Sequence, residues 1–140
     1  MAKMKEVKYI IIHCSATRVN ADYTPEQMER DHKARGFKKI GYHYYIRKDG
    51  TVTEHRGMDE AGAHCKGYNS CSIGICYEGG LDPLGAPADT LTEAQEKSMR
   101  IMIHTLTGMY PGAKVVGHRD LNPNKACPCF NVNEKFKVEE

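Results

Sequence analysis

The chain has 140 residues, the length of one domain, so we predict a single domain over residues 1–140. Hydrophobic residues make up 40% of it and charged residues 27%, a balance that excludes an intrinsically disordered chain. A core of this size needs no metal ion or disulfide merely to stay folded. The net charge of +2 is too small to draw the protein onto nucleic acid, so we expect no nucleic-acid partner.

The N-terminus has only part of the pattern of a signal peptide. Residues 1–8 include lysines, but the apolar run that follows is short and is interrupted by His13. This run is too short for the apolar region of a signal peptide or for a membrane span. We therefore expect a protein that is made and stays in the cytoplasm.

The sequence contains six cysteines, and in a chain without a leader these are more often free thiols or metal ligands than a disulfide framework. They are Cys14, Cys65, Cys71, Cys76, Cys127 and Cys129. Cys65 and Cys71 could approach each other across a loop, but we expect both to be reduced.

Strands and helices are predicted in alternation. Residues 7–12 form an apolar run typical of a buried strand. Thr24 can cap a helix that has Pro25 in its first turn and Gln27 as the partner in a capping box, and Gly36 can end this helix. His32 lies on its apolar side and is interpreted as a packing residue.

A β-hairpin is predicted next. Residues 42–47 and 51–55 flank Asp49 and Gly50, a pair typical of tight turns. The two-residue period of a strand sends Tyr42 and His43 to opposite faces, so only one of them can face a given site.

The second half follows the same pattern of strand and helix. Residues 56–69 read as a surface loop long enough to line a substrate groove, and residues 72–77 as an apolar strand. Thr92 and Gln95 predict a second capping box, opening a helix that ends at Gly108 with His104 in solvent. Residues after Phe130 read as a short charged tail.

Two histidines and a cysteine follow apolar runs at predicted strand ends. His13 follows residues 9–12, and His118 follows residues 114–116, with Cys127 in the loop beyond. Neutral imidazole and thiolate are good zinc ligands, and a catalytic zinc keeps three protein ligands and one open position. We therefore predict a zinc site made by His13, His118 and Cys127. A fourth ligand from Cys14 or Cys129 would instead make a closed, purely structural site.

Several motifs, in order along the chain, resemble those of the zinc N-acetylmuramoyl-L-alanine amidases. They are IIHCSAT (11–17), IGYHY (40–44), DGTV (49–52), GYN (67–69), SIGI (72–75), GH (117–118) and KACP (125–128). The match covers residues 8–130 and is nearest to the short phage lysozymes of amidase type, which share a domain with the peptidoglycan recognition proteins. The resemblance implies an α/β fold with a central mixed sheet flanked by helices.

The same resemblance implies the substrate and several site residues. The bond would be the amide between the lactyl group of N-acetylmuramic acid and the L-alanine of the peptidoglycan stem peptide. Tyr42, rather than His43, would face the metal, and His64 and Asn69 would line the substrate groove.

The residues themselves suggest metal-assisted attack of water on an amide. Lys125 can place an ammonium group beside the carbonyl oxygen, where negative charge develops in the transition state. Tyr42 can offer its hydroxyl to the same oxygen or orient the water, and it could act as the base only if its pKa were lowered.

Other readings stay open at this point. A peptidoglycan sensor without turnover would share the fold, but Cys127, Tyr42 and Lys125 favour an enzyme. The segment 117–120 resembles the recycling and recognition branches, whereas 125–128 resembles the phage branch, so the substrate is intact wall or released muropeptide. We favour a monomeric phage or prophage endolysin that reaches the wall after release or through a pore.

Some phage amidases also bind an RNA polymerase. For this protein such a partner is suggested by that analogy only.

Overall fold

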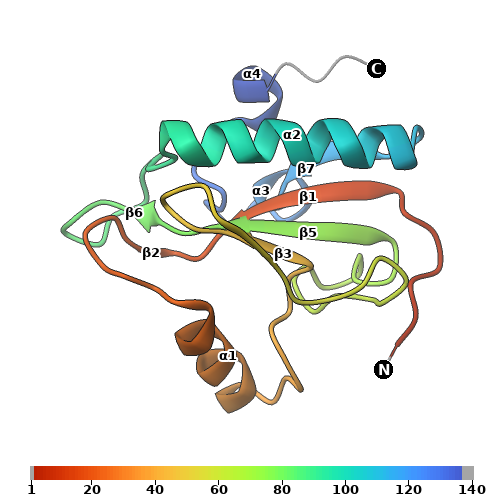
Figure 1. Ribbon diagram of the computed structural model, residues 1–140, viewed down its shortest axis with the longest axis horizontal. Coiled ribbons are helices and arrows are strands. Elements are labelled where there is room, and N and C mark those ends of the chain that lie inside the picture. The colour runs from red at the N-terminus through yellow and green to blue at the C-terminus, as the bar shows by residue number, and fades with distance from the viewer. Residues whose placement is uncertain (1, 137–140) are drawn as a thin grey trace.

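A five-stranded mixed sheet forms the centre of the protein, in the order β4-β3-β5-β1-β7 (Figure 1). The computed structural model describes residues 2–136. The strands are β1 (Tyr9–Cys14), β3 (Tyr44–Ile46), β4 (Val52–Glu54), β5 (Ser72–Tyr77) and β7 (Lys114–Gly117). β1 pairs in parallel with both β5 and β7, and only the predicted β3–β4 hairpin is antiparallel.

Two longer helices cover opposite faces of this sheet. α2 (Glu93–Met109) lies over one face, and α1 (Pro25–Ala34) lies on the other side (Figure 1). Two short helices, α3 (His118–Leu121) and α4 (Val132–Phe136), follow β7. The expected α/β fold with a mixed sheet flanked by helices is therefore confirmed. Among the described residues, no helix is both long and apolar enough to cross a bilayer.

β1 divides its side chains between the two faces. Ile10, Ile12 and Cys14 belong to the main hydrophobic core beneath α2. Because side chains alternate along a strand, Ile11 and His13 project to the face where α1 lies. The polar side chain of His13 is thus presented away from the main core while its strand stays buried between two neighbours.

The caps of the two longer helices differ. At α2 the predicted capping box forms in full: Thr92 Oγ1 accepts the Gln95 N–H at 3.0 Å, and Gln95 Oε1 accepts the Thr92 N–H at 2.9 Å. At α1, Thr24 Oγ1 accepts the Gln27 N–H at 3.1 Å, but Gln27 Oε1 accepts from Arg30 at 2.7 Å instead of from the Thr24 N–H. Only half of that predicted box is present.

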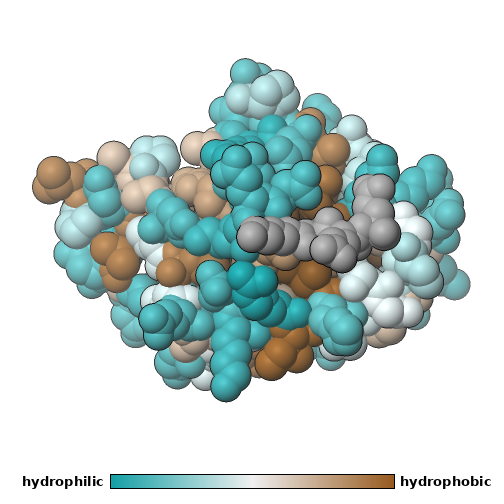
Figure 2. Space-filling view, turned by 90° about the horizontal axis from the view of Figure 1, so that it is seen from above, coloured by the Kyte–Doolittle hydropathy of each residue, from teal (hydrophilic) through white to brown (hydrophobic). Residues whose placement is uncertain are grey.

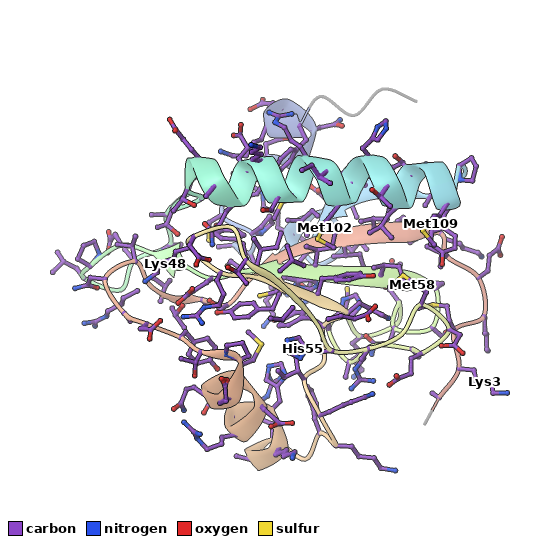
Figure 3. The ribbon with its side chains drawn as sticks, viewed as in Figure 1. Lys3, Lys48, His55, Met58, Met102 and Met109 are labelled. Carbon is purple, nitrogen blue, oxygen red and sulfur yellow. The ribbon has the colours of Figure 1, made fainter. Side chains whose placement is uncertain are left out.

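The outer surface of α2 is mostly polar. Seen from above, this side of the molecule is largely hydrophilic with scattered hydrophobic residues (Figure 2). Met102 lies beneath the helix and packs against the core, whereas Met109 at the end of the helix is exposed (Figure 3). The methionines of α2 thus include core-packing residues.

The prediction of a tail after Phe130 was wrong for residues 131–136. This segment contains α4, whose Val132 and Phe136 are only 1% and 7% exposed and join the main core. Their spacing of four residues puts them on one helical face. Two apolar residues among charged neighbours make too short a pattern to predict a helix from the sequence. Residues 137–140 lie outside the described part of the chain.

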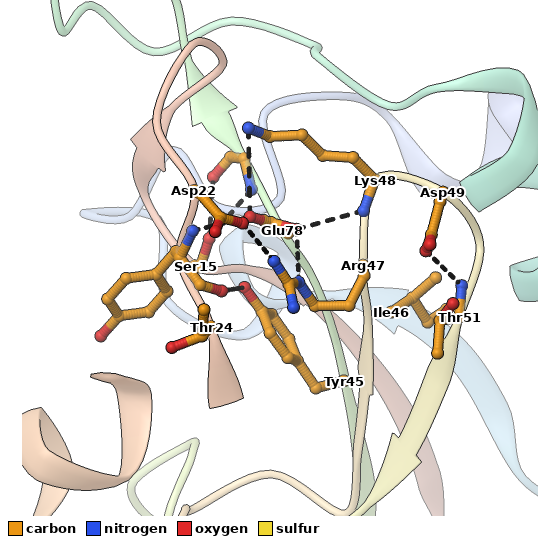
Figure 4. Close-up of polar contacts among 12 residues, drawn as sticks. Ser15, Asp22, Thr24, Tyr45, Ile46, Arg47, Lys48, Asp49, Thr51 and Glu78 are labelled. Atoms are coloured by element: carbon orange, nitrogen blue, oxygen red, sulfur yellow. Dashed lines mark hydrogen bonds and ion pairs between the residues drawn. The ribbon is translucent and has the colours of Figure 1, made fainter. Parts of the chain in front are cut away.

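A second, two-stranded parallel sheet, which the sequence did not predict, joins β2 (Thr17–Arg18) to β6 (Gly80–Leu81). Beside it the carboxylate of Glu78 is only 2% exposed and receives three hydrogen bonds (Figure 4). The donors are Arg47 Nε at 2.8 Å, the Tyr23 N–H at 2.8 Å and the Lys48 N–H at 3.1 Å. Glu78 therefore ties the end of β5 to the β3–β4 hairpin and to the segment before α1.

The pKa of Glu78 reflects its burial and the hydrogen bonds that it accepts. Burial, the largest single influence, raises the pKa, but hydrogen bonds from Arg47 and from the two N–H groups outweigh it and hold the pKa below its ordinary value. A carboxyl with a lower pKa in the folded state stabilises the fold above its unfolded pKa of roughly 4.3. That contribution is lost as the pH falls through the folded-state pKa.

Replacing Glu78 tests this network. We expect Glu78→Gln to lower the free energy of unfolding at neutral pH by about 2–4 kcal/mol, because Arg47 loses its buried charged partner. The difference from wild type should shrink as urea unfolding is repeated at acidic pH below the folded-state pKa. The control is Asp22→Asn: the Asp22 side chain also contacts Arg47 but is 77% exposed, so a change below about 1 kcal/mol is expected. Equal losses in both variants, or a loss independent of pH, would contradict this account.

Candidate metal centre

His13, His118 and Cys127 lie together on the α1 side of the sheet. One ligand atom from each lies within 4.8 Å of the others. Cys127 Sγ is 3.9 Å from His13 Nδ1, and the rings of His13 and His118 have centroids 4.6 Å apart. The structure thus brings together the three residues predicted as ligands, although 105 and nine positions separate them along the sequence.

Neighbouring parallel strands explain how the two histidines meet. His13 is near the end of β1, and β7 pairs beside β1 up to Gly117, so His118 begins α3 at the same edge of the sheet. Asp120 Oδ2 accepts the Gly117 N–H at 2.7 Å and fixes this turn. A Cβ at Gly117 would come within 2.8 Å of the Pro128 ring, so a glycine lets the Cys127 loop close onto β7.

The donor set fits a zinc ion. Tetrahedral zinc ligands lie about 2.0–2.3 Å from the ion and therefore roughly 3.3–3.8 Å from one another. The ligand atoms here lie within 4.8 Å of one another, somewhat wider than that range. Burial, with His64 and His118 as further causes, lowers the pKa of His13 well below its ordinary value, and burial and Lys125 lower that of His118. Both imidazoles are therefore neutral at pH 7 and can donate a lone pair. The Cys14 N–H donates to Cys127 Sγ at 3.0 Å and holds this sulfur beside β1.

The two other cysteines near this group, Cys14 and Cys129, do not complete a closed, four-ligand site. Cys14 Sγ and Cys129 Sγ are paired with each other at 4.0 Å, and Cys129 Sγ also lies 3.3 Å from the Gly80 carbonyl. In the described chain the candidate metal group contains His13, His118 and Cys127 alone. A metal ion held by these three residues would keep one position for water or substrate, as in catalytic sites.

Tyr42 lies beside the metal group. Its ring centroid is 5.0 Å from that of His13. The preceding residue is held tightly: the Gly41 N–H donates to His32 Nδ1 at 3.0 Å, and a Cβ at Gly41 would meet the Ala63 carbonyl. Burial first, and then the nearby thiols, raise the pKa of Tyr42 well above its ordinary value. The phenol is therefore protonated and able to donate a hydrogen bond.

His43 and Lys125 take different positions. His43 Nδ1 accepts the Gly74 N–H at 3.1 Å, and its Nε2 bonds the Glu60 carbonyl at 2.7 Å, which makes it a structural residue. Lys125 is exposed in the loop before Cys127, where its N–H donates to the Asn122 carbonyl at 3.0 Å. Its charge is close enough to contribute to the lowered pKa of His118.

His64 and Asn69, expected to line the groove, make contacts within the protein. His64 Nδ1 lies 2.8 Å from His13 Nε2. Asn69 Oδ1 accepts the N–H groups of His64 and Cys65, each at 2.9 Å, and so shapes the turn that carries His64. Burial, followed by the charges of His43 and His118, lowers the pKa of His64 to about 3, so its ring is neutral.

The sequence reasoning missed the part played by Ser72 and Gly74. Both lie on the face of β5 that is turned toward His64. A signal for this was available: two small residues at alternate positions of an otherwise apolar strand indicate that another group packs closely on that face.

A mixed sheet that presents two imidazoles and a thiol with an open position has the donor set of a metal-dependent hydrolase. The sequence pattern of the family described as N-acetylmuramoyl-L-alanine amidase matches residues 3–130. The chain therefore belongs to the N-acetylmuramoyl-L-alanine amidase family, as its motifs predicted.

Individual relatives agree with this assignment. An endolysin of Enterobacteria phage K11 is 41% identical over 138 residues, which cover 99% of this chain and 91% of that protein. A peptidoglycan-recognition protein of Drosophila melanogaster is 31% identical over 139 residues, covering 96% of this chain and 75% of that protein. Among solved structures, the N-acetylmuramoyl-L-alanine amidase LysC from Clostridium intestinale superposes with a TM-score of 0.81 at 28% identity, covering 99% and 92% of the two chains.

Proposed function

We propose that this amidase is a zinc-dependent endolysin that hydrolyses the bond between N-acetylmuramic acid and L-alanine in peptidoglycan. The observation that carries the proposal is the convergence of His13, His118 and Cys127 next to Tyr42. The endolysin assignment rests on the phage relative, which is similar over nearly the full length of both chains.

The three proposed ligands are prepared for a cation. His13 and His118 are neutral, and Cys127 Sγ accepts a hydrogen bond from the Cys14 N–H. A zinc ion, when bound, supplies a Lewis acid that polarises the amide carbonyl and makes water a better nucleophile. The side chains around the ion would stabilise the charge that develops on the substrate.

Tyr42 and Lys125 would stabilise the developing oxyanion. The protonated phenol of Tyr42 can donate a hydrogen bond to the carbonyl oxygen as it gains charge, and the ammonium group of Lys125 adds a positive charge from the loop before Cys127. Because burial is the largest cause of the raised pKa of Tyr42, we assign its phenol the role of hydrogen-bond donor rather than that of general base.

The rival functions differ from this proposal in turnover and substrate. A recognition module would bind wall fragments without releasing new amino ends. A recycling amidase would prefer soluble muropeptides, whereas an endolysin should act on intact sacculi. Turnover on purified sacculi, compared with turnover on soluble muropeptide, separates these functions.

Metal removal tests the zinc requirement. We expect purified protein to release peptides with a new L-alanine amino end from cell wall, to lose this activity after treatment with a strong chelator, and to regain it with about one equivalent of zinc. Circular dichroism before and after chelation controls for unfolding. Activity that survives removal of all bound metal would contradict the mechanism.

Two substitutions test the proposed oxyanion contacts. Tyr42→Phe should lower kcat about 10²–10³-fold and Lys125→Gln at least about tenfold, because each removes stabilisation that develops in the transition state. Zinc content should stay unchanged in both variants. Lys97→Gln, which changes an exposed lysine of α2 on the opposite face, is the matched control and should keep full activity. A Tyr42→Phe enzyme with unaltered kcat would remove Tyr42 from the mechanism.

A further inference from the structure

A chain of hydrogen bonds runs from the metal group into the protein through His64. His13 Nε2 lies 2.8 Å from His64 Nδ1, and His64 Nε2 lies 3.3 Å from Ser72 Oγ. Ser72 Oγ in turn donates to the Tyr68 carbonyl at 2.6 Å. This series of hydrogen bonds therefore links His13 of β1 to a backbone carbonyl in the loop before β5.

The hydrogen bond from Ser72 to the Tyr68 carbonyl fixes the donor and acceptor of each of the other hydrogen bonds. The Ser72 hydroxyl has one proton, which is given to Tyr68, so its oxygen must accept from His64 Nε2–H. A neutral His64 with its proton on Nε2 has a lone pair on Nδ1, which accepts a hydrogen bond from the Nε2–H of His13. His13 is then left with its lone pair on Nδ1, which is the nitrogen that lies 3.9 Å from Cys127 Sγ.

The protein holds the His64 ring in place by several independent contacts. A Cβ at Gly74 would lie 2.8 Å from the ring, and one at Gly62 would lie 2.4 Å from it. Asn69 Oδ1 accepts the His64 N–H and fixes the backbone of this residue. The ring therefore rests directly on β5, in a space that glycines keep open.

We propose that His64, oriented by Ser72, is a positioning residue that makes His13 bind the metal through Nδ1. The inference rests on the proposed zinc site and assigns to His64 a role different from the substrate contact that the family resemblance implied. Partners that hold the remote nitrogen of a metal-bound histidine typically improve metal affinity 10- to 100-fold.

The first test reads the tautomer directly. Long-range ¹H–¹⁵N correlation spectra of the zinc-free protein should show His13 protonated on Nε2 in the wild type and a mixture of tautomers in His64→Leu. The exposed His104 on α2 provides the control, because His104→Leu should leave the His13 signals unchanged. A His13 tautomer that is the same in His64→Leu and in wild type would overturn the proposal.

The second test measures zinc affinity by competition with a chromophoric chelator. We expect the Kd for zinc to rise about 10- to 100-fold in His64→Leu and by a few-fold in Ser72→Ala. His64→Gln should recover part of the affinity, because its side-chain oxygen can still accept from His13. Thermal unfolding of each variant identifies any that fail to fold, and Ser72→Ala, the smallest change, keeps the test informative in that case.

The outcomes separate this inference from the proposed function. A His64→Leu protein with wild-type zinc affinity would overturn the positioning role. Neither test uses peptidoglycan, so a wild-type protein with the predicted tautomer and affinity but without wall hydrolysis would refute the amidase mechanism and leave the positioning role intact.

Discussion

The parallel pairing of β1 with β5 on one side and β7 on the other is the constraint on which the rest of the structure depends. It buries Ile10 and Ile12 beneath α2 and presents His13 on the opposite face. It also sets the end of β7 beside the end of β1, so that the residue after Gly117 reaches His13. The metal group is therefore a consequence of strand register. A slip of one residue in β1 would turn His13 into the core.

The protein buries several ionisable groups around this sheet and satisfies each with a specific partner. Glu78 accepts hydrogen bonds from Arg47 and two N–H groups, and Arg56 donates to the carbonyls of Ile40 and Ala61. His32 and His43 accept the N–H groups of Gly41 and Gly74. These contacts fix the segments that carry Tyr42 and His64, so the supports of the site are also supports of the fold.

Local patterns explain how much of the fold was predictable. The apolar run of β1, the Asp49–Gly50 turn and the Thr92 capping box each carry their signal within a few residues. The strand-end rule for parallel sheets then extended these signals to His13 and His118. α4 was missed because two apolar residues one turn apart make too short a pattern, and β2 and β6 have two residues each.

The contact between His13 and His64 could not be predicted in the same way. It joins residues 51 positions apart, and the loop that carries His64 has no periodicity. The family resemblance implied that His64 lines the substrate groove, but the geometry of Ser72, Gly74 and Asn69 was needed to indicate what it contacts. Sequence patterns can thus identify the candidate donors of this site, whereas the orientation of each side chain depends on packing between distant segments.

The most direct measurement is the anomalous diffraction of crystals of the zinc-loaded protein at the zinc absorption edge. The account predicts one peak about 2.0–2.3 Å from His13 Nδ1, a ring nitrogen of His118 and Cys127 Sγ, with no protein atom in the fourth position. A peak bound through His13 Nε2, or one that takes Cys14 or Cys129 as a fourth ligand, would contradict it.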